Sequence, residues 1–199
     1  MYLYPKWIRL WHILNAVLCL ILIFSGLNLQ YSGKFISLEK AIRLHNVSGM
    51  ILTVSYLFFF VGNMVSSNRK HYRIRFKNLM QRVSKQIRYY ATGIFKGEKN
   101  PFYVEKENKF NPIQKVSYIF IMYLCLPLII LTGWDLMFPG TFSIPLIGVK
   151  GLVISDLIHI IGGFILSVFL ILHIYLCTIG PTTGSLFMSI LSGYHPGDD

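Results

Sequence analysis

The feature that most constrains this sequence is its division into four long apolar blocks. A helix that crosses a bilayer needs about 20 apolar residues, and each block is long enough. Charged residues make up only 14% of the chain, whereas soluble domains carry about 25%. The sequence therefore predicts an all-α fold, an integral membrane four-helix bundle that forms one domain over residues 1–199. The predicted spans run from about 7–29, 41–65, 113–134 and 152–179.

The first block follows Lys6 and Arg9, as the apolar part of a signal peptide would. Because it is long and lacks a small-x-small cleavage site, we predict a retained first span. The cysteines, Cys19, Cys125 and Cys177, each stand alone in an apolar block. This spacing predicts packing residues and argues against a disulfide framework, a structural zinc site or a c-type haem attachment.

The basic residues are distributed unevenly about the predicted spans. Fifteen of the 19 Lys and Arg lie at the N-terminus (Lys6 and Arg9) or in residues 66–115, and four lie on the opposite side. Cytoplasmic loops of membrane proteins carry this excess. We therefore predict that both termini and the loop 66–112 are cytoplasmic. The net charge of +11 then reflects membrane orientation and predicts no nucleic-acid partner.

The long loop contains apolar residues at helical spacing, with basic residues on the other faces. This pattern predicts an amphipathic helix that lies on the anionic lipid of the inner leaflet. The alternative is a solvated basic loop. The apolar positions are Leu79, Val83, Ile87, Tyr90 and Ile94.

Four of the six histidines lie within predicted spans, where a polar ring is costly unless it has a partner. The other two, His71 and His195, lie in loop segments and are expected to be exposed. His159 and His173 are fourteen residues apart, so they share one helix face about 21 Å apart. His12 begins the first span and His45 begins the returning second span. Matched depth therefore predicts the pairs His12/His173 and His45/His159.

Facing histidines at two depths are what two bis-histidine haem sites in a helix bundle require. The sequence therefore predicts His12, His45, His159 and His173 as axial ligands to the iron of two b-type haems. Small residues one turn beyond the histidines would admit the macrocycle or serve helix packing, and nearby arginines would pair with haem propionates. The small residues are Gly49, Gly162, Gly163 and Ala16, and the arginines are Arg9 and Arg43.

Together these features resemble the prokaryotic four-helix di-haem cytochrome b subunits of respiratory complexes. That family includes the gamma subunit of formate dehydrogenase, the b-type cytochrome of nickel–iron hydrogenase and thiosulfate-reductase-type relatives. The resemblance covers nearly the whole chain. Beside the His159/His173 pair, it rests on W-I-R-L-W-H at 7–12, L-H-N-V-S-G at 44–49, R-Y-Y-A-T-G-I-F-K-G-E at 88–98 and F-N-P-I-Q-K at 110–115.

The resemblance implies that the two histidines of the fourth span ligate separate haems, one shared with the first span and one with the second. It also implies a menaquinone or ubiquinone site near the cytoplasmic haem, with Asn111 and Gln114 as contacts beside His173. Amides can hydrogen-bond a quinone carbonyl. The alternative is that Asn111, before a proline, only caps the third helix.

The expected function is that of a membrane-anchoring di-haem subunit of a respiratory oxidoreductase complex in a bacterial or archaeal cytoplasmic (inner) membrane. It would transfer electrons between an outer-side redox partner and the quinone pool. Implied partners are an iron–sulfur or multihaem c-type subunit and a catalytic subunit. One alternative is a free-standing, quinol-oxidising di-haem cytochrome. The other is a haem-free anchor or transporter, which the absence of an inverted repeat disfavours.

Overall fold

The computed structural model describes residues 1–105, 108–139, 150–180 and 182–195. This part of the chain is helical and contains no β-strand, only an isolated bridge between Tyr2 and Tyr194. Four helices are long and apolar enough to span a membrane, which confirms the predicted bundle. They are α1 (Lys6–Gln30), α2 (Leu38–Val65), a third span built from α4 (Pro112–Phe120), η4 (Ile121–Cys125) and α5 (Leu126–Met137), and α6 (Gly151–Cys177).

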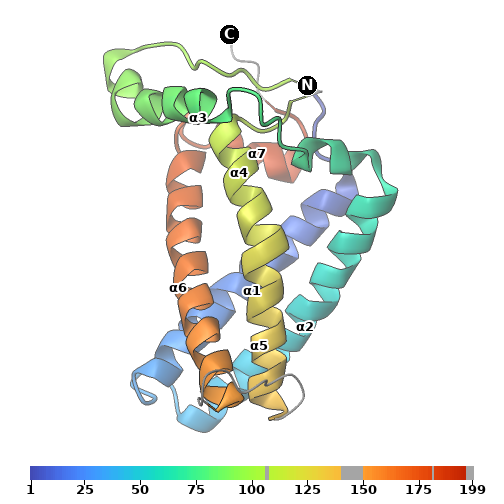
Figure 1. Ribbon diagram of the computed structural model, residues 1–199, viewed down its shortest axis with the longest axis vertical. Helices are drawn as coiled ribbons and strands as arrows, with labels where there is room; N and C mark the ends of the chain where they lie inside the picture. The colour runs from blue at the N-terminus through green and yellow to red at the C-terminus, as the bar shows by residue number, and fades with distance from the viewer. Residues whose placement is uncertain (106–107, 140–149, 181, 196–199) are drawn as a thin grey trace.

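The spans pack as two hairpins, α1 along α2 and α5 along α6. A small apolar cluster joins the first hairpin to the third span, through Leu18, Leu52, Tyr56 and Leu126. The N-terminus, the end of the described chain at His195 and the short helices lie at one end of the bundle, and the turn between α1 and α2 lies at the other (Figure 1). We call these ends the loop side and the far side.

A single buried amide organises the far-side turn between α1 and α2. The Asn28 Oδ1 atom accepts hydrogen bonds from the backbone N–H groups of Phe35 (2.8 Å) and Ile36 (3.1 Å), and its Nδ2 donates to the Ile36 carbonyl (2.9 Å). Asn28 is fully buried. Because buried amides must be hydrogen-bonded, this residue fixes the spacing at which α2 returns beside α1.

The helix type of the third span changes just before Pro127. The preceding turn, η4, is π-helical, so Leu126 donates its N–H to Ile121 rather than to Met122. Proline has no N–H to offer in its place. The Met122 carbonyl instead accepts the Tyr56 hydroxyl from α2 at 3.0 Å. This bond ties the first hairpin to the third span at its irregular point.

The predicted loop helix is present as α3 (Leu79–Arg88), continued by the π-helical turn η2 (Tyr89–Gly93) and the 3-10 turn η3 (Ile94–Lys96). Ile87 is 54% exposed, and Gln86, a polar residue, is fully buried. Contact of this helix with lipid stays a prediction. Near the end of the described chain, α7 (Ser185–Ser192) is a short helix between Gly184 and Gly193.

Both loop histidines are buried, contrary to expectation. His71 lies in the 3-10 turn η1 (Ser67–Tyr72) and is 3% exposed. Its ring centroid is 6.4 Å from that of Phe110. His195 is 8% exposed because the end of the chain pairs with its beginning. Its N–H donates to the Met1 carbonyl at 2.8 Å, and the Met1 amino group donates back to the His195 carbonyl at 2.9 Å.

Removal of the Tyr56 hydroxyl should destabilise the bundle. The Tyr56→Phe variant leaves the Met122 carbonyl without its partner, and an unsatisfied buried acceptor costs about 1–3 kcal/mol. Thermal unfolding in detergent should therefore show a lower Tm for this variant. Tyr31→Phe, the same change at a 63% exposed residue, is the control and should unfold like the wild type. Equal Tm values for the two variants would contradict the role of Tyr56.

Candidate functional site

The four membrane histidines form two facing pairs. The His12 ring of α1 lies opposite the His173 ring of α6, with centroids 6.1 Å apart. The His45 ring of α2 lies opposite the His159 ring of α6, also at 6.1 Å. The first pair is on the loop side and the second on the far side. The structure thus brings together the pairs that depth matching predicted.

This spacing is the one that two imidazoles on one metal ion would have. A bond from a metal to a histidine nitrogen is about 2 Å long, and the nitrogen lies about 1 Å from its ring centre. Two ligands on opposite sides of a metal therefore place their ring centroids about 6 Å apart. Both observed separations match, so the donor sets fit a haem iron bound through two histidines.

The protonation of the far-side rings follows from their hydrogen bonds. His45 Nδ1 lies 2.9 Å from the Ser25 Oγ atom of α1. The Ser25 hydroxyl donates its own proton to the Ile21 carbonyl at 2.7 Å. Because a hydroxyl has one proton, Ser25 accepts from His45. Nδ1 therefore carries the hydrogen, and the Nε2 lone pair is free for a metal.

His159 is held in the same way from α5. Its Nδ1 lies 3.0 Å from the Ile129 carbonyl oxygen, which can only accept, and 3.1 Å from the Thr132 Oγ1 atom. The Thr132 hydroxyl donates to the Leu128 carbonyl at 2.7 Å. Nδ1 is therefore the protonated nitrogen here too. Such outer hydrogen bonds orient the ring of a metal-binding histidine.

Glycines on the neighbouring helices make room for the far-side rings. A Cβ atom on Gly133 of α5 would lie 3.0 Å from His159 Cε1, and one on Gly26 of α1 would lie 3.4 Å from His45 Cε1. The small residues expected from the sequence act differently. A Cβ on Gly162 would lie 2.6 Å from Ile129, so Gly162 serves helix packing, whereas Gly163 faces open space.

Aromatic rings surround the loop-side pair. The His173 ring stacks on Phe169 at 5.7 Å with an interplanar angle of 16°, and Tyr118 of α4 contacts it edge-on at 6.0 Å. The Cys177 sulfur lies 3.9 Å from His173 Nε2. The loop-side rings are therefore placed mainly by packing, unlike those of the far-side pair.

The two arginines proposed for propionates lie in different settings. Arg9 donates its Nε–H to the Ile190 carbonyl of α7 at 3.2 Å, which ties α1 to the C-terminal helix. Its guanidinium lies one turn from His12 and has further N–H groups. Arg43 is exposed at the far side. A propionate role for either residue stays a prediction.

The two amides expected at a quinone site are paired with each other. Asn111 and Gln114 form a complete capping box at the start of α4, with Pro112 at the first helical position. The capping role that the sequence analysis held open is therefore present. Asn111 Nδ2 also donates to the Tyr90 hydroxyl of η2 at 2.8 Å. Among the described residues, the Gln114 amide nitrogen has no protein acceptor.

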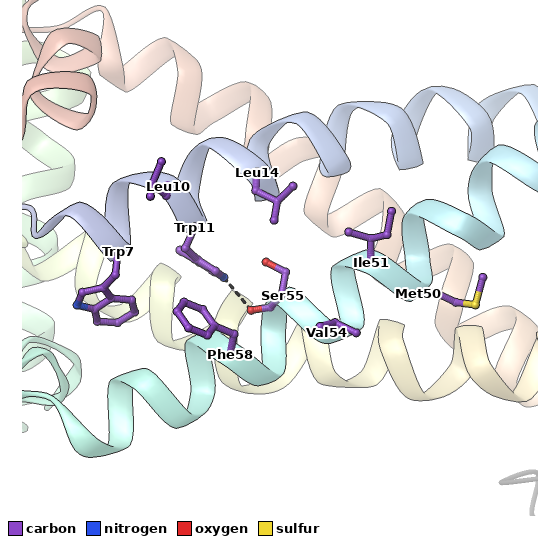
Figure 2. A pocket seen from close by; sticks show the side chains of 9 residues that line it. All are labelled: Trp7, Leu10, Trp11, Leu14, Met50, Ile51, Val54, Ser55 and Phe58. Carbon is purple, nitrogen blue, oxygen red and sulfur yellow. Dashed lines mark hydrogen bonds between the residues drawn. The ribbon is translucent and has the colours of Figure 1, made fainter.

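An apolar groove of about 660 Å³ lies between α1 and α2 (Figure 2). Trp11 donates its ring N–H to the Ser55 carbonyl at 3.0 Å along its wall. None of its lining residues is a histidine. The lining residues are Trp7, Leu10, Trp11, Leu14, Met50, Ile51, Val54, Ser55 and Phe58.

The fold and the site define a multi-pass membrane protein with histidine pairs suited to haem. In the described residues no group of three or more His, Cys, Asp or Glu could hold a bare metal ion. Residues 3–193 match the family described as prokaryotic cytochrome b561. "Putative cytochrome YdhU" of Escherichia coli (strain K12) is 38% identical over 195 residues, covering 98% of this chain and 74% of the relative.

The chain therefore belongs to the prokaryotic cytochrome b561 family, whose members are membrane proteins that bind b-type haem. The sequence analysis missed the residues that hold the far-side rings. Ser25-Gly26 and Thr132-Gly133 are hydroxyl–glycine dipeptides placed within spans near the depth of His45 and His159. That shared pattern was the available signal.

Enlarging the two glycines should disturb haem binding to different degrees. Gly133→Ala places a methyl group 3.0 Å from the His159 ring and should displace it, whereas Gly26→Ala, at 3.4 Å, makes an ordinary contact. Haem per chain, measured as the pyridine adduct, should fall clearly in Gly133→Ala and little in Gly26→Ala. Full haem content in Gly133→Ala would contradict the close fit of the ring. The helical fraction from circular dichroism should stay unchanged.

Proposed function

We propose that this protein is the membrane-anchoring di-haem cytochrome b subunit of a respiratory oxidoreductase complex. It transfers electrons across the membrane between a far-side redox partner and a quinone on the loop side. The observation that carries the proposal is the pair of 6.1 Å histidine separations, one at each end of α6. One pair would support a single haem, whereas two pairs about 21 Å apart along a helix support a route across the bilayer.

The chain's own groups supply axial ligands and orientation. His45 and His159 would hold one haem through Nε2, since their Nδ1 atoms donate to the Ser25 hydroxyl, the Thr132 hydroxyl and the Ile129 carbonyl. His12 and His173 would hold the other. When bound, haem b supplies one-electron redox chemistry that no amino-acid side chain here offers. The surrounding apolar helices exclude water and keep the electron on this route.

The loop-side end carries groups suited to a quinone. Gln114 has an amide nitrogen without a protein acceptor, and Asn111 lies beside it in the capping box. Burial raises the pKa of the Tyr90 hydroxyl, so it stays protonated at neutral pH and can donate as well as accept. These groups stand near Tyr118, which contacts His173. We therefore assign quinone binding to this end, with Gln114 as the donor to a carbonyl.

The proposed orientation follows from charge. The basic loop, the N-terminus and the end of the described chain at His195 lie on the loop side (Figure 1), so the positive-inside rule assigns this side to the cytoplasm. The partner, an iron–sulfur or c-type electron-transfer subunit with its catalytic subunit, would then dock on the far side. Quinone reduction with cytoplasmic protons and electrons from the far side would build a transmembrane potential.

Each membrane histidine should be needed for one haem. Replacing His45 or His159 with Ala should remove the far-side haem, and replacing His12 or His173 should remove the loop-side haem. The double variant His45→Ala/His159→Ala should therefore keep one haem per chain. His71→Gln and His195→Gln are buried-histidine controls and should keep two. Retention of both haems in the double variant would rule out these ligands.

The quinone contact should be separable from the helix cap. Gln114→Leu removes the amide donor, and loss of one hydrogen bond of about 1.4 kcal/mol lowers binding about tenfold. The rate at which a menaquinol or ubiquinol analogue reduces the haem should fall accordingly, with the dithionite-reduced spectrum unchanged. Gln114→Glu also lacks the amide donor but keeps a side-chain oxygen for the Asn111 N–H, so it should lower the rate as Gln114→Leu does if the donor and not the cap is responsible. An unaltered quinol rate in Gln114→Leu would count against the assigned contact.

A further inference from the structure

The two histidine pairs differ in how their rings are hydrogen-bonded. On the far side, both rings donate Nδ1–H to oxygen acceptors, at 2.9 Å to Ser25 and at 3.1 and 3.0 Å to Thr132 and the Ile129 carbonyl. On the loop side, within the part of the chain that the structure describes, neither ring has a hydroxyl or carbonyl acceptor. The neighbours of the His173 ring are aromatic rings and the Cys177 thiol.

The far-side hydroxyls are constrained to accept. The Ser25 and Thr132 hydroxyl protons are each directed to a carbonyl four residues earlier in the same helix, at 2.7 Å in both cases. The oxygen lone pairs are then presented to the histidine rings. In each dipeptide the following glycine admits the Cε1 edge of the ring. On both α1 and α5, a hydroxyl residue therefore accepts a hydrogen bond from a histidine ring, and the glycine that follows it makes room for that ring.

An acceptor on the outer N–H of a ligating imidazole makes the metal-bound nitrogen more basic. A more basic ligand stabilises the oxidised iron, which carries one more positive charge, and so lowers the reduction potential. This effect acts on the far-side pair and is missing from the loop-side pair. This difference in hydrogen bonding would therefore make the far-side haem harder to reduce than the loop-side haem.

We propose that Ser25 and Thr132 are positioning residues that fix the orientation and tautomer of the far-side histidines and set the far-side haem at a lower potential than the loop-side haem. The inference rests on the proposed di-haem function and adds a direction to it. Electrons then run downhill from the far side to the loop side. A far-side donor reducing a loop-side quinone is the favoured use of the protein.

The test is a spectroelectrochemical titration of the purified holoprotein and its variants. The wave that disappears in the His45→Ala/His159→Ala variant is the far-side haem, and in the wild type it should be the lower-potential wave. Ser25→Ala should raise that wave, and Thr132→Val should raise it less, because the Ile129 carbonyl still accepts from His159 Nδ1 at 3.0 Å. The equilibrium constant for its reduction should increase by up to about tenfold, which is about 59 mV for one electron. The loop-side wave should not move.

Conservative and control variants separate positioning from general structural damage. Ser25→Thr and Thr132→Ser restore an acceptor and should restore the wild-type potential. Ser25→Cys keeps the size but offers a weaker acceptor, so it should give an intermediate potential with the haem still bound. Ser167→Ala is the matched control, because the Ser167 hydroxyl donates to its own helix at 2.7 Å and has no histidine partner. It should leave both waves in place.

The outcomes distinguish this inference from the function it rests on. Fewer than two haems in the wild type would overturn the proposed function itself. Two haems with a higher-potential far-side wave would overturn the proposed order. The role assigned to Ser25 and Thr132 would be overturned by far-side waves in Ser25→Cys and Thr132→Val that equal the wild-type wave, or by a shift of both waves by equal amounts in either variant.

Discussion

Four neutral imidazole rings inside an apolar helix bundle are the constraint on which this structure depends. Each ring has one N–H and one lone pair, and hydrocarbon satisfies neither. An unpartnered buried donor or acceptor costs about 1–3 kcal/mol. The bundle sets the rings opposite each other in two pairs between its two hairpins, with ring centroids 6.1 Å apart in each pair. A metal between facing rings uses the lone pairs, and the N–H groups then need acceptors.

The two ends of the bundle differ in the acceptors that they offer to the histidine N–H groups. At the far side, hydroxyls on α1 and α5 and the amide of Asn28 give a rigid, hydrogen-bonded frame. At the loop side, stacked rings, the Asn111 capping box and the half-buried Tyr90 leave a polar end beneath α3. A rigid end suits electron entry from a docked protein, and a polar end suits a quinone that takes up protons.

Much of this arrangement could be predicted from the sequence, because hydrophobic length and histidine depth are one-dimensional properties. The spans and the partner of each histidine follow from the positions of His12, His45, His159 and His173 along the helices. Helix rotation is not available from depth, so the contacts of Ser25 and Thr132 could not be predicted with the same certainty. Burial of His71 and His195 depends on distant contacts with Phe110 and Met1. Their local sequence, which is basic for one and glycine-rich for the other, carries no trace of those contacts.

The central claim is that this chain binds two haems between two histidine pairs. The most direct test is the ratio of haem to protein in the purified wild type. Haem is quantified as the pyridine adduct and protein by amino-acid analysis. The dithionite-reduced minus oxidised spectrum identifies the haem type. The account predicts two b-type haems per chain with low-spin, bis-histidine spectra. One haem, or none in protein from haem-replete cells, would contradict it.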